Sequence, residues 1–196
     1  MQQSTRLTLI CHAVTPQQKK GSFPDDESVA MDWRNAGLSL AGRYRNPRLL
    51  CGPEARTRQT AGMFSRNPVV ENALRDGDFG RWKGKDLNEV DRDELADWIG
   101  SSASTAHGGE SVDQVCARVG RWMKSLETHP GHVVAVTHPF VIRAAMLYVM
   151  QFPISMFYLI DVEPLSATEL RFNQIWRLRL QTHAQVPEHG KIHAPH

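Results

Sequence analysis

The sequence predicts an α/β fold, a three-layer α/β/α sandwich with a mainly parallel sheet. Short apolar stretches rich in Val, Ile and Leu alternate with segments of helical period across residues 5–180. Such alternation is typical of parallel strands that are connected by helices. No internal repeat and no linker divides this region, and a chain of 196 residues can bury one full core. We therefore expect a single domain over residues 1–182.

The β-rich stretches fall into two groups. The first three are almost wholly apolar, which is typical of strands buried on both faces. Three later stretches indicate further strands, and the last of them alternates as an edge strand does. The first group is 6–10, 48–52 and 132–138, and the second is 157–162, 167–172 and 176–181.

The clearest predicted helix follows the segment HGGES. Ser111 and Gln114 form a capping-box pattern, and the apolar residues after them repeat on one helical face. Further helices are expected at 55–66 and at 139–150, where a proline suits the first turn. LSLAGRYR (38–45) is expected to lead as a helix into the second strand. The apolar face after Ser111 consists of Val112, Val115, Cys116, Val119, Trp122, Met123 and Leu126.

Composition excludes several classes of function. The net charge of +2 is too small to indicate a nucleic-acid partner, and no apolar run is long enough to cross a bilayer. The first residues lack the pattern of a secretory signal, and the three cysteines lack metal-like spacing. We therefore expect a cytoplasmic protein with reduced thiols. Residues 183–196 carry four histidines without a hydrophobic period, and we expect them to form a flexible tail.

Three predicted strands lead into chemically capable side chains. His12 and His138 end the first and third strands, and Arg56 lies in the segment after the second. Ligands of parallel sheets bind beyond the carboxyl ends of the strands. Helix starts follow Arg56 and His138, and free backbone N–H groups there favour anions. Two imidazoles and a guanidinium at one edge would form a phosphate pocket, although scattered loop residues would give the same spacing.

Six segments in order resemble motifs of the histidine phosphatase superfamily, also called phosphoglycerate mutase-like. The resemblance covers about residues 6–180 and implies the phosphoglycerate mutase-like form of the α/β/α sandwich. The family's opening strand with Arg-His-Gly and an acidic-Thr pair resembles LTLICHAVT (7–15), in which Cys11 and Ala13 replace the Arg and the Gly. The other segments are LSLAGRYRN (38–46), CGPEARTRQTA (51–61), LRDGDFGRWKG (74–84), GGES (108–111) and VTHPFVIRA (136–144).

The resemblance implies a role for each matching residue. His12 attacks phosphorus and becomes phosphohistidine, and Asp76 protonates the leaving group and then activates water. Arg56 and His138 hold the phosphoryl oxygens. The family's chemistry needs no metal and no cofactor. The residues expected to contact substrate are Thr15, Arg56, Glu110 and Arg143, and Ser111 needs no role beyond capping its helix.

Two positions depart from the family pattern. Cys11 stands where the family has a phosphate-binding arginine, so one bidentate contact is missing. We expect a basic group to fill this gap, and the candidates are Lys19, Lys20, Arg34 and Arg143. Asp76 stands where the family has Glu and is shorter by one methylene, so Asp78 and Glu71 are alternatives for the acid.

Three functions follow from the sequence. The first is a metal-independent phosphomonoester hydrolase acting on a small phosphorylated substrate, as a monomer or a homodimer. The second is a weak or inactive relative that binds a phosphorylated or anionic metabolite as a regulatory module. The third is a phosphatase for phosphohistidine in proteins. A mutase is disfavoured because the gap between Gly84 and GGES is short, and a cysteine phosphatase is excluded because Thr57 occupies the position where its arginine would follow Cys51.

The substrate itself cannot be read from the sequence. In this family variable loops cap the pocket, and residues 16–35 and 85–107 would supply them here without a diagnostic motif. Trp33, Trp82 and Trp98 are candidates for apolar walls, although aromatic core residues would give the same pattern.

Overall fold

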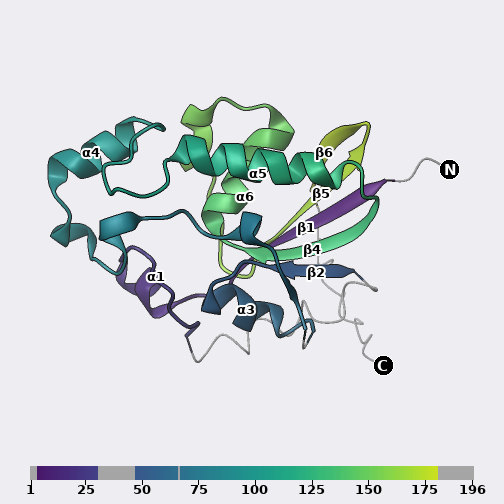
Figure 1. The fold of residues 1–196 in the computed structure, drawn as a ribbon, viewed down its shortest axis with the longest axis horizontal. Helices are drawn as coiled ribbons and strands as arrows, with labels where there is room; N and C mark the ends of the chain where they lie inside the picture. Colours follow the sequence, from purple (N-terminus) through teal and green to yellow (C-terminus); the bar gives the residue numbers. More distant parts are fainter. Residues whose placement is uncertain (1–3, 31–46, 66, 181–196) are drawn as a thin grey trace, which may run out of the picture.

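A computed structural model describes residues 4–30, 47–65 and 67–180 (Figure 1). Its centre is a six-stranded sheet in the order β3-β2-β4-β1-β5-β6. Strands β1, β2, β3 and β4 pair in parallel, and β5 and β6 pair antiparallel at one side. The sheet is therefore mainly parallel, as predicted. The strands are β1 Thr5–Cys11, β2 Arg48–Cys51, β3 Val69–Val70, β4 Gly131–Thr137, β5 Ala167–Asn173 and β6 Ile175–Arg179.

Helices cover both faces of this sheet (Figure 1). On one face α5 and α6 pack on side chains of β1 and β4, among them Leu7, Leu9 and Ala135. On the other face Ala61 of α3 packs on Ile10 and neighbouring β4 residues. This gives the three predicted layers. The helices are α1 Pro16–Lys20, α3 Ala55–Ala61, α4 Arg92–Gly100, α5 Val112–Leu126 and α6 Pro139–Met150, with short 3-10 helices at Asn72–Leu74, Gly80–Trp82, Leu87–Glu89 and Ile154–Leu159.

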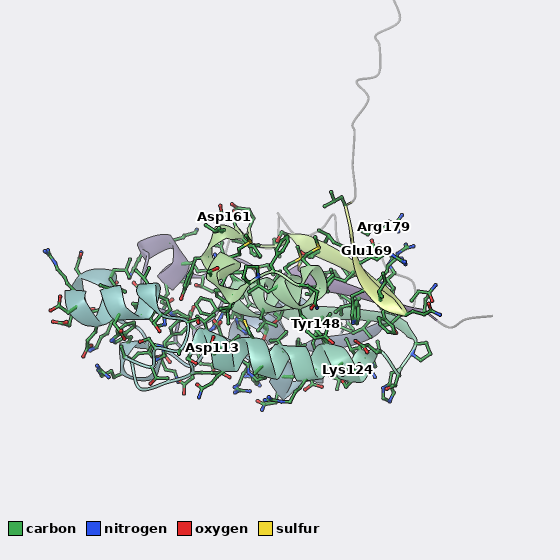
Figure 2. The ribbon with its side chains drawn as sticks, turned by 90° about the horizontal axis from the view of Figure 1, so that it is seen from above. Asp113, Lys124, Tyr148, Asp161, Glu169 and Arg179 are labelled. Carbon is green, nitrogen blue, oxygen red and sulfur yellow. The ribbon has the colours of Figure 1, made fainter. Side chains whose placement is uncertain are left out.

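Helix α5 forms as its sequence predicts. The Ser111 hydroxyl accepts from the Gln114 backbone N–H, and the Gln114 side chain accepts from the Ser111 N–H, so the capping box is complete. Asp113 lies in the first turn and Lys124 in the last (Figure 2), where each charge complements the helix dipole. The apolar face lies against the sheet, and it also buries Arg118, a charged residue that the sequence pattern did not single out.

Two of the predicted elements differ from the structure. The strand expected at 157–162 is wrong, because Ile154–Leu159 is a 3-10 helix that starts after Pro153. Only Phe157 within that helix is buried, and Leu159 is 76% exposed, so the apolar run does not face a core on both sides. The helix expected at 55–66 is shorter than predicted, since it ends at Ala61. The helix expected at 38–45 and the tail at 183–196 lie outside the described residues.

The parallel register aligns the strand ends that carry the site. Cys11 of β1 pairs with Thr137 of β4, and Cys51 of β2 pairs with Val136. The residues that follow therefore leave the sheet at one edge. Helices α1 and α4, which the sequence analysis did not predict, lie beyond that edge at the left of Figure 1.

A second, smaller core lies beside the same edge. Trp82 and Trp98, two of the tryptophans considered as pocket walls, are buried together with Phe23, Phe79 and Val90. Trp33 lies outside the described residues. Within the described residues, no helix is long and apolar enough to span a membrane.

Candidate active site

His12 is held as a neutral imidazole with one nitrogen free. The ring is 2% exposed, and Nδ1 lies 2.8 Å from the Ala13 carbonyl oxygen. A carbonyl oxygen only accepts, so the proton is on Nδ1 and the lone pair is on Nε2. Burial, and then the charge of His138, lower the pKa of His12 to about 3. The ring lines a cavity of about 240 Å³ at the sheet edge.

His138 lies between two carboxylates. Its Nδ1 is 3.2 Å from Asp76 Oδ2, and its Nε2 is 2.8 Å from Glu54 Oε2. Burial alone would lower the pKa of this fully buried ring, but Asp76 first and then Glu54 outweigh it and raise the pKa. Both ring nitrogens then donate, so His138 is an imidazolium. Its ring meets that of His12 edge to face, with centroids 5.1 Å apart.

Arg56 is 2% exposed and is surrounded by acceptors. Nη2 donates to Asp76 Oδ2 at 2.7 Å, and Nη1 donates to the Asp25 carbonyl and lies 3.4 Å from Glu27 Oε2. Nε lies 3.3 Å from His138 Nδ1, but that nitrogen carries the proton that faces Asp76. The contact between Nε and Nδ1 is therefore a close approach of two cations, which the carboxylates offset.

Asp76 joins these groups. Oδ1 accepts from the Gly77 N–H at 2.9 Å, and Oδ2 faces Arg56 and His138. Burial would raise the pKa of this carboxyl, but His138 and then Arg56 outweigh it and hold the pKa well below its usual range. The lowered pKa keeps Asp76 ionised in this structure.

Cys11 is buried in an environment that does not activate its thiol. Burial, with a smaller contribution from the Asp76 charge, raises the pKa of its thiol to about 12. The charge of Arg143 acts on the same thiol in the opposite direction. Arg143 projects from α6 and lines the cavity beside His12. Its Nε donates to the Ile160 carbonyl at 2.7 Å, which anchors the guanidinium.

Arg118 of α5 binds the loop that carries Asp76. Arg118 donates through Nη1 to the carbonyls of Ala73 and Arg75 at 2.7 and 3.0 Å, and through Nη2 to that of Asp76 at 3.3 Å. Its Nη2 also pairs with Glu110 Oε2 at 2.7 Å. Glu110 was expected to contact substrate. The structure places its carboxylate between Arg118 and Arg75, and it is not among the residues that line the cavity.

The described residues that line the cavity do not include Thr15, Asp78, Glu71, Lys19 or Lys20. Thr15 caps α1, where its hydroxyl accepts from the Gln18 N–H. Among the alternatives to Asp76, the Asp78 side chain is half exposed and pairs with Lys83, and Glu71 caps a 3-10 helix. The basic candidates Lys19 and Lys20 are exposed on α1, and Arg34 lies outside the described residues. The residues brought together at the site are His12, Arg56, Asp76, His138 and Arg143.

The sequence analysis missed Glu54 and Gly52. Glu54 Oε1 accepts from the Asp76 N–H at 3.0 Å while Oε2 binds His138, so one carboxylate spans both residues. A Cβ at Gly52 would lie 2.9 Å from the Leu74 carbonyl and 3.1 Å from His138 Nε2, which makes a side chain there costly. Both lie within CGPEARTRQTA, where Arg56 was the residue expected at the site. The helix N-cap position of Glu54 was the available signal.

Within the described residues, no three His, Cys, Asp or Glu side chains converge in a way that could hold a metal ion.

Comparison with known proteins gives several relatives. The Bifunctional protein Rv2228c of Mycobacterium tuberculosis is 32% identical over 130 residues, which are 60% of this chain and 36% of that protein. The chain thus spans well under half of that relative. The structure called Mycobacterial hydrolase 1 has a TM-score of 0.78 at 23% identity, covering 90% of this chain and 97% of that one. A mycobacterial glucosyl-3-phosphoglycerate phosphatase complexed with VO3 has a TM-score of 0.77 at 24% identity, covering 90% and 98%.

The structural similarity shows that this chain shares the fold of these proteins. A family model identifies the superfamily to which it belongs. The model of the histidine phosphatase superfamily (branch 1) matches residues 7–181, a span that contains every site residue described above. This chain belongs to the histidine phosphatase superfamily.

Proposed function

We propose that this chain is a phosphomonoester hydrolase that acts without a metal through a phosphohistidine on His12. The single observation that carries the proposal is the state of His12, which is neutral, buried at the cavity wall and oriented by the Ala13 carbonyl. A nucleophilic imidazole needs a free lone pair at the attacking nitrogen, and the proton on Nδ1 leaves it at Nε2. The name of the phosphatase with a similar fold accords with this proposal.

In the first step Nε2 of His12 bonds to phosphorus as the bond from phosphorus to the leaving oxygen breaks. The phosphoryl oxygens contact Arg56, His138 and Arg143, whose charges stabilise the transition state. Arg143 thereby supplies the phosphate contact that the family's arginine makes from the position of Cys11. It reaches the cavity from α6, and its charge acts on the Cys11 thiol.

Asp76 supplies and recovers the proton. In the unliganded site it is ionised by its partners His138 and Arg56, so it must first gain a proton. A phosphate dianion that binds Arg56 removes one of these partners and raises the pKa of Asp76. Because His138 keeps its proton to hold the phosphoryl oxygens, Asp76 gains this proton from solvent through the cavity that it lines. Asp76 then protonates the leaving oxygen, and in the second step it accepts a proton from the water that attacks phosphohistidine.

A second function is favoured by one observation. The guanidinium of Arg56 is already engaged by Asp25, Glu27 and Asp76, and Cys11 supplies no charge. Such a site would bind an anionic metabolite weakly without hydrolysis, as a regulatory module.

The experiment that separates the two functions detects the covalent intermediate. The wild-type protein and His12→Ala are mixed with p-nitrophenyl phosphate, quenched in denaturant at alkaline pH because phosphohistidine is acid-labile, and analysed by peptide mass spectrometry. The phosphatase predicts phosphate on His12 and turnover that is lost in His12→Ala. Equal, slow hydrolysis by both proteins with no phosphopeptide contradicts it and leaves the binding function.

A further inference from the structure

The cavity has one acidic wall that the proposed chemistry does not use. The Glu27 side chain is 8% exposed and lines the cavity together with His12 and Arg56. Its Oε2 accepts from the Asp25 N–H at 2.9 Å and faces Arg56 Nη1 at 3.4 Å. Its Oε1 is buried and has no hydrogen-bond partner in the part of the chain that the structure describes.

A buried carboxylate oxygen without a donor is costly, so this atom indicates a group that arrives with the ligand. Glu27 contacts Arg56, the proposed phosphate-binding residue, and would therefore lie beside a bound phosphate. A phosphate dianion next to the Glu27 carboxylate would be repelled. A substrate that carries its own positive charge on the leaving group would satisfy Oε1 and remove this repulsion.

The walls around Glu27 favour a cation over a neutral hydroxyl. Phe79 and Phe140 line the same cavity with rings 5.2 Å apart, and aromatic faces attract cations. A neighbouring hollow shares Pro24, Arg56 and Asp76 with the cavity. Its other walls include Asp25 and Asp26, whereas the remaining charged residues are already paired: Glu54 with His138, Arg75 with Glu110 and Lys83 with Asp78.

We propose that the substrates of this site are phosphomonoesters whose leaving group carries an ammonium group, which binds Glu27 Oε1 beside Phe79 and Phe140. This inference rests on the proposed phosphatase function for its reaction, and on the Glu27 geometry for its specificity. Glu27 therefore determines specificity and takes no part in the phosphoryl transfer.

The test compares three substrates of nearly equal size. These are 2-aminoethyl phosphate, propyl phosphate, which replaces the ammonium with a methyl group, and 2-hydroxyethyl phosphate, which keeps a donor without charge. Wild type is expected to show kcat/KM about 10- to 100-fold higher for the amine than for the other two, as a charged hydrogen bond would give. Glu27→Gln abolishes this preference, so that kcat/KM for the amine falls to the level of kcat/KM for propyl phosphate in the same variant. Glu94→Gln, the same change at an exposed pair with Arg81, keeps the preference.

Each other outcome has a distinct meaning. Equal kcat/KM for the amine and propyl phosphate in wild type, an equal gain for the hydroxyl compound, or a preference retained in Glu27→Gln overturns the inference and leaves the phosphatase intact. If none of these compounds nor p-nitrophenyl phosphate is hydrolysed, the proposed function fails. Calorimetric titration of wild type with the same three compounds then decides the inference separately, and equal Kd values for the amine and propyl phosphate overturn it.

Discussion

His12 and His138 lie edge to face with ring centroids 5.1 Å apart, yet they hold opposite protonation states. The pKa of His12 is lowered to about 3 by burial and by the neighbouring cation, whereas two carboxylates raise that of His138. The difference arises because Asp76 and Glu54 contact only the second ring. Two neighbouring titratable groups with very different pKa values are typical of acid and base roles in active sites. Here the difference makes His12 a neutral nucleophile and His138 a cation that can bind an anion.

The first prediction concerns stability in acid. The pKa of His12 is about 3 in the folded protein against an ordinary 6.5, so between these values the unfolded chain binds a proton that the native protein does not. Stability therefore falls as pH decreases from 6.5 toward 3, by up to about 1.4 kcal/mol per pH unit from this residue. Urea unfolding of wild type and His12→Asn at several pH values between about 7 and 4.5 measures it.

The difference between the two proteins isolates His12, because the remaining histidines titrate in both. Parallel curves of unfolding free energy against pH for wild type and His12→Asn would show that His12 is not buried as a neutral ring.

The second prediction concerns Glu54, whose Oε2 lies 2.8 Å from His138 Nε2. His138 has a raised pKa, so its imidazolium and the activity that needs it are present at low pH and are lost as pH rises through that pKa. Glu54→Gln keeps a hydrogen-bond acceptor but removes the charge. We expect the alkaline limb of the kcat/KM profile to move to lower pH. An unchanged limb, with Glu94→Gln as the reference, would limit Glu54 to a packing role.

The third prediction concerns Arg143. If its guanidinium replaces the missing family arginine, Arg143→Met lowers kcat/KM for p-nitrophenyl phosphate by about 10²- to 10³-fold, as loss of an oxyanion contact does. Arg143→Lys recovers little, because one ammonium cannot both bind the Ile160 carbonyl and contact phosphate in a fixed fork. The exposed Arg177→Met is the matched control. Wild-type kinetics in Arg143→Met would refute the replacement.

The fourth prediction concerns Cys11. Its thiol is fully buried, and burial raises its pKa to about 12, so it stays protonated at neutral pH and is not a nucleophile, and its S–H is only a weak donor. Iodoacetamide should leave Cys11 unmodified in the native protein. Cys11→Ala should retain kcat and lose about 1–2 kcal/mol of stability from the small cavity. A large loss of kcat in this variant, without unfolding, would give Cys11 a chemical role.

The fifth prediction concerns the support of the Asp76 loop. Arg118→Met leaves the 10% exposed Glu110 carboxylate paired with the partly exposed Arg75 and removes the donor to the loop carbonyls of Ala73 and Arg75. We expect the free energy of unfolding to fall by about 3–5 kcal/mol, the cost of breaking a buried ion pair. The double variant Arg118→Met/Glu110→Met should regain part of this loss because the buried carboxylate, which had lost its buried partner, is gone. Denaturant melts of the three proteins measure both effects, and a double variant no more stable than the single would contradict them.

The strong local patterns predicted most of the central sheet. The apolar runs around Leu7 and Val134 mark strands because only buried positions tolerate such runs, and Ser111 with Gln114 marks a helix start through local hydrogen bonds. The strand predicted at 157–162 was wrong because an apolar run alone does not distinguish a strand from a 3-10 helix, which the structure shows at Ile154–Leu159. Helices α1 and α4 were missed because their polar, exposed faces carry little periodic signal.

The sequence by itself determined which side chains could do chemistry here, since His12, Arg56 and His138 follow elements whose ends must meet at one edge of a parallel sheet. Only the tertiary structure decided their charge states and partners. The carboxylate of Glu54 on His138, the Arg118 guanidinium of α5 on the Asp76 carbonyl and the carboxylate of Glu27 beside Arg56 all join residues far apart in the chain. A pKa depends on burial and on charges a few ångströms away, and neither quantity is written in the order of the residues.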